Sequence, residues 1–434
     1  MSSSGFITRV RDELMGFSKR EQQLLLGGTL ALFCVTFIYA ICRPISNSFF
    51  VSTYGSKFYP YAWLAVVPFN YLAVSLFNRF VSKIGCLRIF FIIIGLIISL
   101  DLFAAFLIDK FHSLPFIYYV WKEIYILLLF HQTWAVIHSA VDVKRSKYLY
   151  GVFFSFGGLG GLLGSGIVMG CTSSITSGPL LLASIPACLF LTYLYTKMVR
   201  VAGAVAKSQQ VSDVKTASQI SLRHGINLIM RSPLLFCILG IVVFMQLATA
   251  LIDYQFYTHL GKAFATTDLR TQYSATAFTI INAVKFPLQL FGAYLLIKFI
   301  GVRRTHLVSP IILAGHTLAF LFFPTFAVIS ASFISLKTLD FSIFGISKES
   351  LYVKLTPEEK FQAKSVIDIF AYRSAKAIGS FLIIGFSASQ LVNWVHSLTL
   401  IILATLTGWI LFVALSFKSE LVENVQEEAV KAPS

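Results

Sequence analysis

Several charged side chains fall within stretches of this sequence that are otherwise apolar. They are Arg43, Asp101, Asp253, Lys285, Lys337, Asp340, Asp368, Arg373 and Lys376. A charge at the middle of a bilayer costs about 2.5–3.5 kcal/mol on insertion scales, so one that persists usually faces water or a partner. Ion pairs between helices, or snorkelling near a helix end, would account for any single residue. As a set, they indicate that some of them line a pathway for a solute.

Spacing separates the charges near residues 364–388 into two faces of a helix. Arg373 and Lys376 are three residues apart and lie nearly on one face, whereas Asp368 is about 140° from Arg373. We therefore expect the two cations to share a cavity and Asp368 to pair with another helix. Lys337 and Asp340, also three residues apart, are close enough to pair locally.

Lys285 is a candidate anion-binding residue because its own predicted helix carries no acidic residue nearby. Pro287 follows two residues later and frees a backbone carbonyl beside it. An unpaired cation beside a broken helix suits the binding of an anion.

Other motifs argue against an enzyme or a metal protein. The glycine-rich run at 157–166 lacks the preceding strand and the Gly-Lys-Ser/Thr ending of a phosphate loop, and its small residues favour close helix packing. The eight histidines form no HExxH motif, no G-x-S-x-G elbow is present, and the six cysteines lack CxxC spacing. We expect no enzyme activity, no metal and no cofactor.

The composition places these charges in a membrane protein. The chain has 434 residues, of which 57% are hydrophobic and 12% charged, against about 25% charged in soluble domains. With about 20 apolar residues per span, we predict an all-α protein of about twelve transmembrane helices. The expected spans are 24–45, 61–81, 87–108, 116–140, 149–170, 178–198, 233–256, 272–297, 305–323, 325–346, 364–388 and 392–416. The first apolar run is too long for a signal-peptide core of about 7–15 residues, so we expect it to be retained.

The loops set the domain organisation and the orientation. A polar stretch at 199–231 separates two six-helix halves, 24–198 and 232–417, with cytoplasmic ends at 1–23 and 418–434. This is the layout of the major facilitator superfamily, whose halves rock about a central site. Most of the 35 Lys and Arg residues fall on the side of the N-terminus, so both termini are predicted to be cytoplasmic. The predicted outer segments hold only Lys57, Lys110, Lys122, Lys262 and Arg270. The net charge of +16 therefore reflects membrane topology, and no nucleic-acid partner is expected.

Several segments resemble the non-mitochondrial ATP/ADP translocases of chlamydiae, rickettsiae and plastids, or their divergent bacterial branch. The segment 342–379 resembles the family's S-L-F-x-P-T-K-E-x-x-Y, K-x-K-x-x-I-D and R-x-G-K motifs. The matching residues are Lys348, Glu349, Tyr352, Lys360, Lys364, Asp368, Arg373 and Lys376. Tyr39 to Gly55, with Arg43, is similar to the family's opening block, Glu123 matches a family acidic residue, and 146–150 is similar to its A-K-R-F-Y motif.

The sequence also departs from that family. Where translocases carry a lysine after the first-span arginine, this chain reads Pro44-Ile45-Ser46-Asn47, and its seventh span has Asp253 in place of a Glu and a Lys.

The resemblance implies a secondary transporter of nucleotides, or of a related anionic phosphorylated metabolite, in a bacterial inner membrane. For such a transporter we expect Arg43, Lys285, Arg373 and Lys376 to bind the substrate, and Glu123, Asp253, Asp340 and Asp368 to serve in coupling or ion pairing. A proton-coupled transporter of another solute, with Asp101, Asp253 and Asp340 as proton carriers, is the main alternative. A membrane receptor or scaffold is the third.

Overall fold

Helices form the regular secondary structure throughout the described part of the chain. The structure, a computed structural model, describes residues 15–140, 147–208, 222–289, 293–352, 355, 366–388 and 394–417. Within these ranges, nine helices are long and apolar enough to cross a membrane. The predicted all-α membrane class is therefore confirmed, whereas the number of twelve spans remains a prediction.

The chain divides into two compact units, and each combines separate stretches of sequence. Unit 1 comprises Met1–Thr53, Pro68–Thr216 and Thr266–Ala283, and unit 2 comprises Tyr54–Val67, Ala217–Ala265 and Val284–Ser434. The helices α3 (Tyr59–Ile84) and α10 (Thr267–Pro287) each contribute residues to both units. The division of the sequence into halves at 24–198 and 232–417 remains a prediction.

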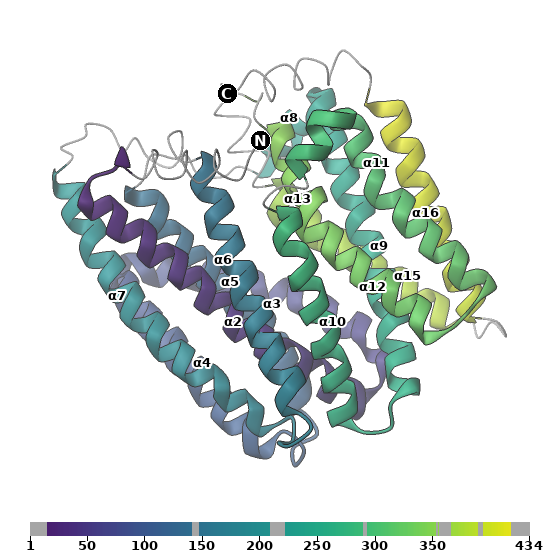
Figure 1. Ribbon diagram of the computed structural model, residues 1–434, viewed down its shortest axis with the longest axis horizontal. Coiled ribbons are helices and arrows are strands. Elements are labelled where there is room, and N and C mark those ends of the chain that lie inside the picture. Colours follow the sequence, from purple (N-terminus) through teal and green to yellow (C-terminus); the bar gives the residue numbers. More distant parts are fainter. Residues whose placement is uncertain are drawn as a thin grey trace. The chain divides into compact units, whose positions relative to one another are not determined.

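Unit 1 contains five complete helices and a short 3₁₀ turn. They are α2 (Lys19–Tyr54), α4 (Cys86–Leu107), α5 (Leu114–Ala140), α6 (Lys147–Cys171), η3 (Pro179–Ala183) and α7 (Ser184–Ser208). Helices α4 and α7 run side by side, and α5 packs on both (Figure 1). Gly85, with φ 85°, lies between α3 and α4 in a conformation that favours glycine, so the chain can turn sharply there.

The glycine-rich run of α6 packs directly on α2. A Cβ on Gly164 would lie 2.5 Å from the carbonyl oxygen of Phe37, and one on Gly160 would overlap the carbonyl oxygen of Phe33. Thr36 Oγ1 donates a hydrogen bond of 2.7 Å to the carbonyl oxygen of Gly157. The expectation that this run serves close helix packing is therefore confirmed.

The amino-terminal part of α10 is tied to unit 1 by hydroxyl and carboxylate hydrogen bonds. Thr267 Oγ1 and Arg270 Nη1 each donate 2.8 Å bonds to Ser52 Oγ at the end of α2. The backbone N–H of Ser177 donates a 2.8 Å bond to Asp268 Oδ1. These bonds hold the helix whose residue Phe278 faces the functional region described below.

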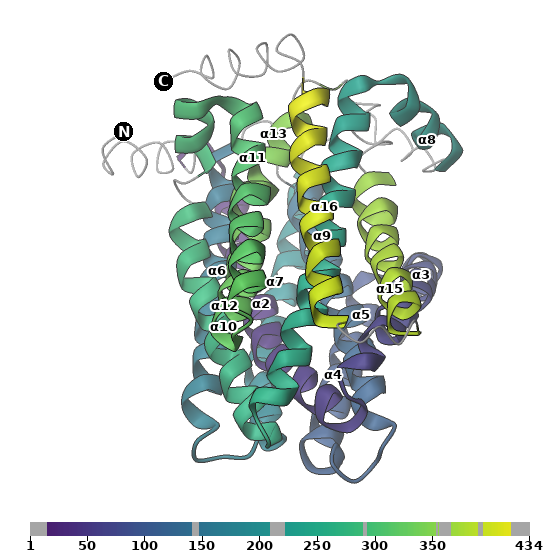
Figure 2. The same cartoon turned by 90° about the vertical axis from the view of Figure 1, so that its right-hand side faces the viewer.

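Unit 2 is built around the long helix α9 (Pro233–Ala263). Its other elements are η1 (Ser56–Phe58), α8 (Leu222–Arg231), α11 (Ala293–Phe322), α12 (Phe326–Leu339), η5 (Asp340–Phe344), α13 (Gly345–Leu351), η7 (Val366–Ala371), α15 (Tyr372–Ala388) and α16 (Trp394–Ser416). Helices α12, α15 and α16 all pack on α9, and α16 also packs on α11 (Figure 2). Segments η5 and η7 are π-helical, a geometry that often marks functional positions.

The observed boundaries differ from the predicted spans in a few places. Helix α2 continues to Tyr54, well beyond the predicted end at residue 45. Gly301, with φ 80°, interrupts α11 between the predicted eighth and ninth spans. Part of the polar stretch at 199–231 is helical, because α7 reaches Ser208 and α8 covers Leu222–Arg231. The predicted tail 418–434 lies outside the described residues.

Candidate functional site

One face of α2 presents three polar side chains toward the interior of unit 1. Tyr39, Arg43 and Asn47 are spaced four residues apart, so they follow one another along the same side of the helix. The Arg43 guanidinium carbon lies 4.3 Å from the ring centroid of Phe278 and 5.4 Å from that of Tyr39. Two aromatic faces therefore stabilise this half-buried cation.

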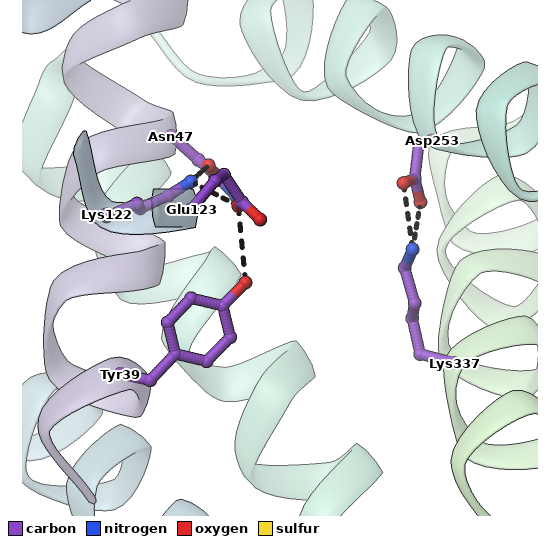
Figure 3. A network of polar contacts seen from close by, with 6 residues as sticks. All are labelled: Tyr39, Asn47, Lys122, Glu123, Asp253 and Lys337. Atoms are coloured by element: carbon purple, nitrogen blue, oxygen red, sulfur yellow. Dashed lines mark hydrogen bonds and ion pairs between the residues drawn. The ribbon is translucent and has the colours of Figure 1, made fainter. Parts of the chain in front are cut away.

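Helix α5 places an adjacent lysine and glutamate against this face of α2. Lys122 Nζ lies 2.8 Å from Asn47 Oδ1 and 3.2 Å from Glu123 Oε1, and it lies 3.8 Å from the Tyr119 ring centroid. The Tyr39 hydroxyl donates a 3.2 Å bond to the same Glu123 oxygen (Figure 3). We call Tyr39, Arg43, Asn47, Lys122 and Glu123 the polar cluster. It holds two cations and one carboxylate.

The assignment of Lys122 to an outer segment was wrong. Lys122 is completely buried, and it lies about 12 Å along α5 from Leu114 at 1.5 Å per residue. A hydropathy pattern marks where a helix runs, but it does not distinguish a charge near the helix end from one folded against a neighbouring helix. The signal that could have identified Lys122 was its place beside Glu123 within the predicted span 116–140.

Unit 2 contains a second buried lysine, with a different partner geometry. Lys337 Nζ of α12 lies 2.7 Å and 2.8 Å from the two carboxylate oxygens of Asp253 on α9 (Figure 3). Both side chains are almost completely buried, at 4% and 6% exposed. The spacing argument predicted Asp340 as a local partner. The ion pair described for Lys337 crosses to Asp253 on another helix, and the local pairing with Asp340 remains a prediction.

The other predicted binding cations of unit 2 lie against aromatic rings. Lys376 Nζ is 4.6 Å from the Trp63 ring centroid, and Lys285 Nζ is 5.6 Å from that of Phe341. Both lysines are half-buried. Within the described residues, Lys376 takes part in no ion pair. A cation–π contact is worth about 0.5–2 kcal/mol, less than the cost of placing a charge at the centre of a membrane.

Three remaining predicted residues are placed in π-helical or adjoining segments. Asp340 is buried and is the first residue of η5. Asp368 lies in η7 and Arg373 in α15, and both side chains lie outside the described part of the structure. Whether Arg373 and Lys376 share a cavity therefore remains a prediction.

Asp101 is bonded by neutral hydrogen-bond donors, whereas the buried Asp253 is paired with a lysine. It accepts 2.6 Å bonds from the Tyr118 and Ser184 hydroxyls, and Cys42 Sγ lies 3.9 Å away. In the part of the chain that the structure covers, no ion pair involves Asp101. Among the same residues, no group of three or more His, Cys, Asp or Glu side chains could hold a metal ion.

Comparisons with known proteins find carriers that are similar to this chain. The TLC ATP/ADP transporter family matches residues 327–419. The ADP,ATP carrier protein 3 of Rickettsia bellii is 21% identical, with 87% of this chain and 90% of that protein aligned. Its counterpart in Rickettsia prowazekii is 20% identical, over 87% and 89% of the two chains.

Solved structures show the same fold. The crystal structure of the nucleoside transporter NupG superposes with a TM-score of 0.60 at 13% identity, covering 92% of this chain and 98% of NupG. A mutant form of NupG gives 0.61 at 13% identity, over 91% and 100% of the two chains.

The fold is that of a multi-pass α-helical membrane protein and is shared with NupG. The proteins that this chain is similar to are carriers and transporters rather than enzymes. Along most of its length the chain is similar to the ADP,ATP carriers, which confirms the resemblance drawn from its motifs.

Proposed function

We propose that this chain is a secondary transporter that moves nucleotides, by ATP/ADP-type exchange, or a related phosphorylated anion by alternating access. The observation that carries the proposal is the set of membrane-embedded cations placed against aromatic rings, namely Arg43, Lys285 and Lys376. An anionic cargo would supply negative charge to these groups, and aromatic surfaces suit a nucleobase.

The charges divide into two proposed roles. Arg43, Lys285, Arg373 and Lys376 would attract and hold the phosphoryl groups, because a guanidinium or ammonium forms strong charge-assisted hydrogen bonds with phosphate oxygens. Glu123, Asp253, Asp340 and Asp368 would hold cations in place or couple the two states.

Asp253 is one of the positions at which this sequence departs from the ATP/ADP translocases, which have other charged residues there. Without a partner, the Asp253 carboxylate would repel an anion. Since Lys337 contacts both of its carboxylate oxygens, its charge is compensated within the protein. Asp253 is therefore compatible with an anionic cargo. We further propose a bacterial inner membrane location with both termini in the cytoplasm.

Uptake into proteoliposomes tests this function. Purified protein would be reconstituted in vesicles loaded with unlabelled ADP and presented with labelled ATP, ADP and other nucleotides. We expect uptake that depends on the internal nucleotide and is at least about tenfold lower for Arg43→Gln, in line with the loss of one charge-assisted contact. Vesicles that contain correctly inserted protein and move no nucleotide or related phosphorylated anion would refute the proposal.

Asp101 supports a second candidate, a proton-coupled transporter. A buried carboxyl group surrounded by hydroxyl donors, without a described cationic partner, is suited to bind and release a proton. Uptake driven by an imposed pH gradient without an internal counter-substrate, and lost in Asp101→Asn, would favour this function over exchange.

A further inference from the structure

The Lys122–Glu123 pair has a geometry suited to separation. Neighbouring residues on a helix point about 100° apart, so these side chains must bend toward each other to interact. The contact that results involves Glu123 Oε1 at 3.2 Å. It is longer than the contacts of 2.7 Å and 2.8 Å that Lys337 makes with the two carboxylate oxygens of Asp253.

Exposure distinguishes the two members of the pair. The Lys122 side chain is 0% exposed, whereas Glu123 is 29% exposed. Lys122 is also positioned by Asn47 and by the ring of Tyr119. The ammonium is therefore the fixed member, and the carboxylate is the member that can move toward solvent.

We propose that Lys122 is a phosphoryl-binding residue whose ammonium is occupied by Glu123 in the empty transporter. A phosphoryl oxygen of the cargo replaces the Glu123 carboxylate on Lys122, while Arg43, on the α2 face that also carries Asn47, supplies a second cation. This inference rests on the proposed function for the phosphorylated nature of the cargo.

Competition between Glu123 and the cargo also provides for release. A phosphoryl group carries up to about two negative charges and forms stronger contacts with an ammonium than a single carboxylate oxygen does. When the cargo leaves, Glu123 returns to Lys122 and again provides the counter-charge of the buried ammonium. Tyr39 remains within reach of Glu123 and helps to guide it back.

Pyrophosphate binding by the purified protein tests the inference without requiring transport. The dissociation constant would be measured by thermal shift for the wild type, Lys122→Gln, Lys122→Arg and Glu123→Gln. Lys57→Gln, at an exposed position outside the polar cluster, controls for the loss of one positive charge.

We expect Lys122→Gln to weaken pyrophosphate binding about tenfold or more, the effect of losing one hydrogen bond between charged groups. Lys122→Arg should retain most of the affinity, Lys57→Gln should match the wild type, and Glu123→Gln should bind several-fold more tightly because the competing carboxylate is gone. Unchanged binding by Lys122→Gln, weaker binding by Glu123→Gln, or no binding by the wild type would each overturn the inference.

A variant at Asn47 keeps the test informative if either charge substitution prevents folding. Asn47→Asp preserves the shape of the side chain and places a permanent carboxylate beside Lys122, so pyrophosphate binding should weaken. Binding equal to that of the wild type would contradict the inference.

Transport separates this inference from the proposed function. If the wild type exchanges nucleotides but substitution of Lys122 leaves the dissociation constant for pyrophosphate unchanged, the inference fails and the proposed function stands. If pyrophosphate binding depends on Lys122 and Glu123 but no nucleotide or other phosphorylated anion moves, the function fails and the binding site stands.

Discussion

Lys122 and Lys337 are both buried lysines, but their surroundings differ. Lys337 Nζ contacts both carboxylate oxygens of Asp253, and the pair joins two helices within unit 2. Lys122 contacts one oxygen of its neighbour Glu123 on the same helix, and it reaches α2 through the neutral amide of Asn47. The first arrangement holds helices together. The second places a buried ammonium beside a partly exposed carboxylate.

This difference suggests how a membrane transporter keeps charges in its interior for separate purposes. A buried ion pair between helices is costly to break, because removing one member leaves an uncompensated buried charge. A pair with one partly exposed member can exchange that member for an ion from solution. Substitutions that change only one of the two ion pairs, Lys337–Asp253 or Lys122–Glu123, test this difference.

The largest effect is expected from Asp253→Asn, which leaves the Lys337 ammonium buried and without its ionised partner. We expect a loss of about 3–5 kcal/mol in the free energy of unfolding, measured by denaturant titration in mixed micelles. The double variant Asp253→Asn/Lys337→Gln should recover part of this loss, since no buried charge remains. If the single variant is as stable as the wild type, the pair does not hold α9 and α12 together.

A smaller effect is expected where α6 supports the helix that carries the polar cluster. Gly164→Ala should lower the free energy of unfolding by about 1–3 kcal/mol, because the added carbon meets the rigid backbone of α2. Gly166→Ala, on the same helix with nothing within 4 Å of the added carbon, should be neutral or stabilising by up to about 1 kcal/mol. Equal effects of the two substitutions would show that the close contact does not constrain α2.

Glu123→Gln should cost less than Asp253→Asn, about 1 kcal/mol, because a glutamine oxygen can still accept from Tyr39 and Lys122. The same titration in mixed micelles measures the change. A loss as large as that of Asp253→Asn would mean that Glu123 is a structural counter-ion rather than a replaceable one.

The smallest effect is expected at the aromatic contact of Lys376. Trp63→Phe retains an aromatic ring but weakens its attraction for a cation, so we expect about a twofold change in the KM for transport, equivalent to a few tenths of a kcal/mol. Trp409→Phe, at a buried tryptophan of α16, is the matched control for losing an indole. A large fall in the maximal rate of Trp63→Phe alone would point to a structural role.

The membrane class and much of the candidate site follow from the sequence. An apolar composition requires helices with internally satisfied backbone groups, and charges within apolar runs are rare enough to be recognised individually. Arg43, Asp253 and Lys376 were identified on that basis, and Glu123 through the family resemblance. Lys122 was missed because hydropathy treats a lysine near the start of a span as a loop residue.

The sequence by itself determined that the chain crosses a membrane, where most helices run and which charges lie inside them. These properties depend on local composition and on the helical period. Only the tertiary structure decided that Lys337 pairs with Asp253, that Asn47 meets Lys122, and that Phe278 covers Arg43. Those partners come from helices far apart in the chain, and the spacing of residues along one helix does not specify which neighbouring helix its side chains will meet.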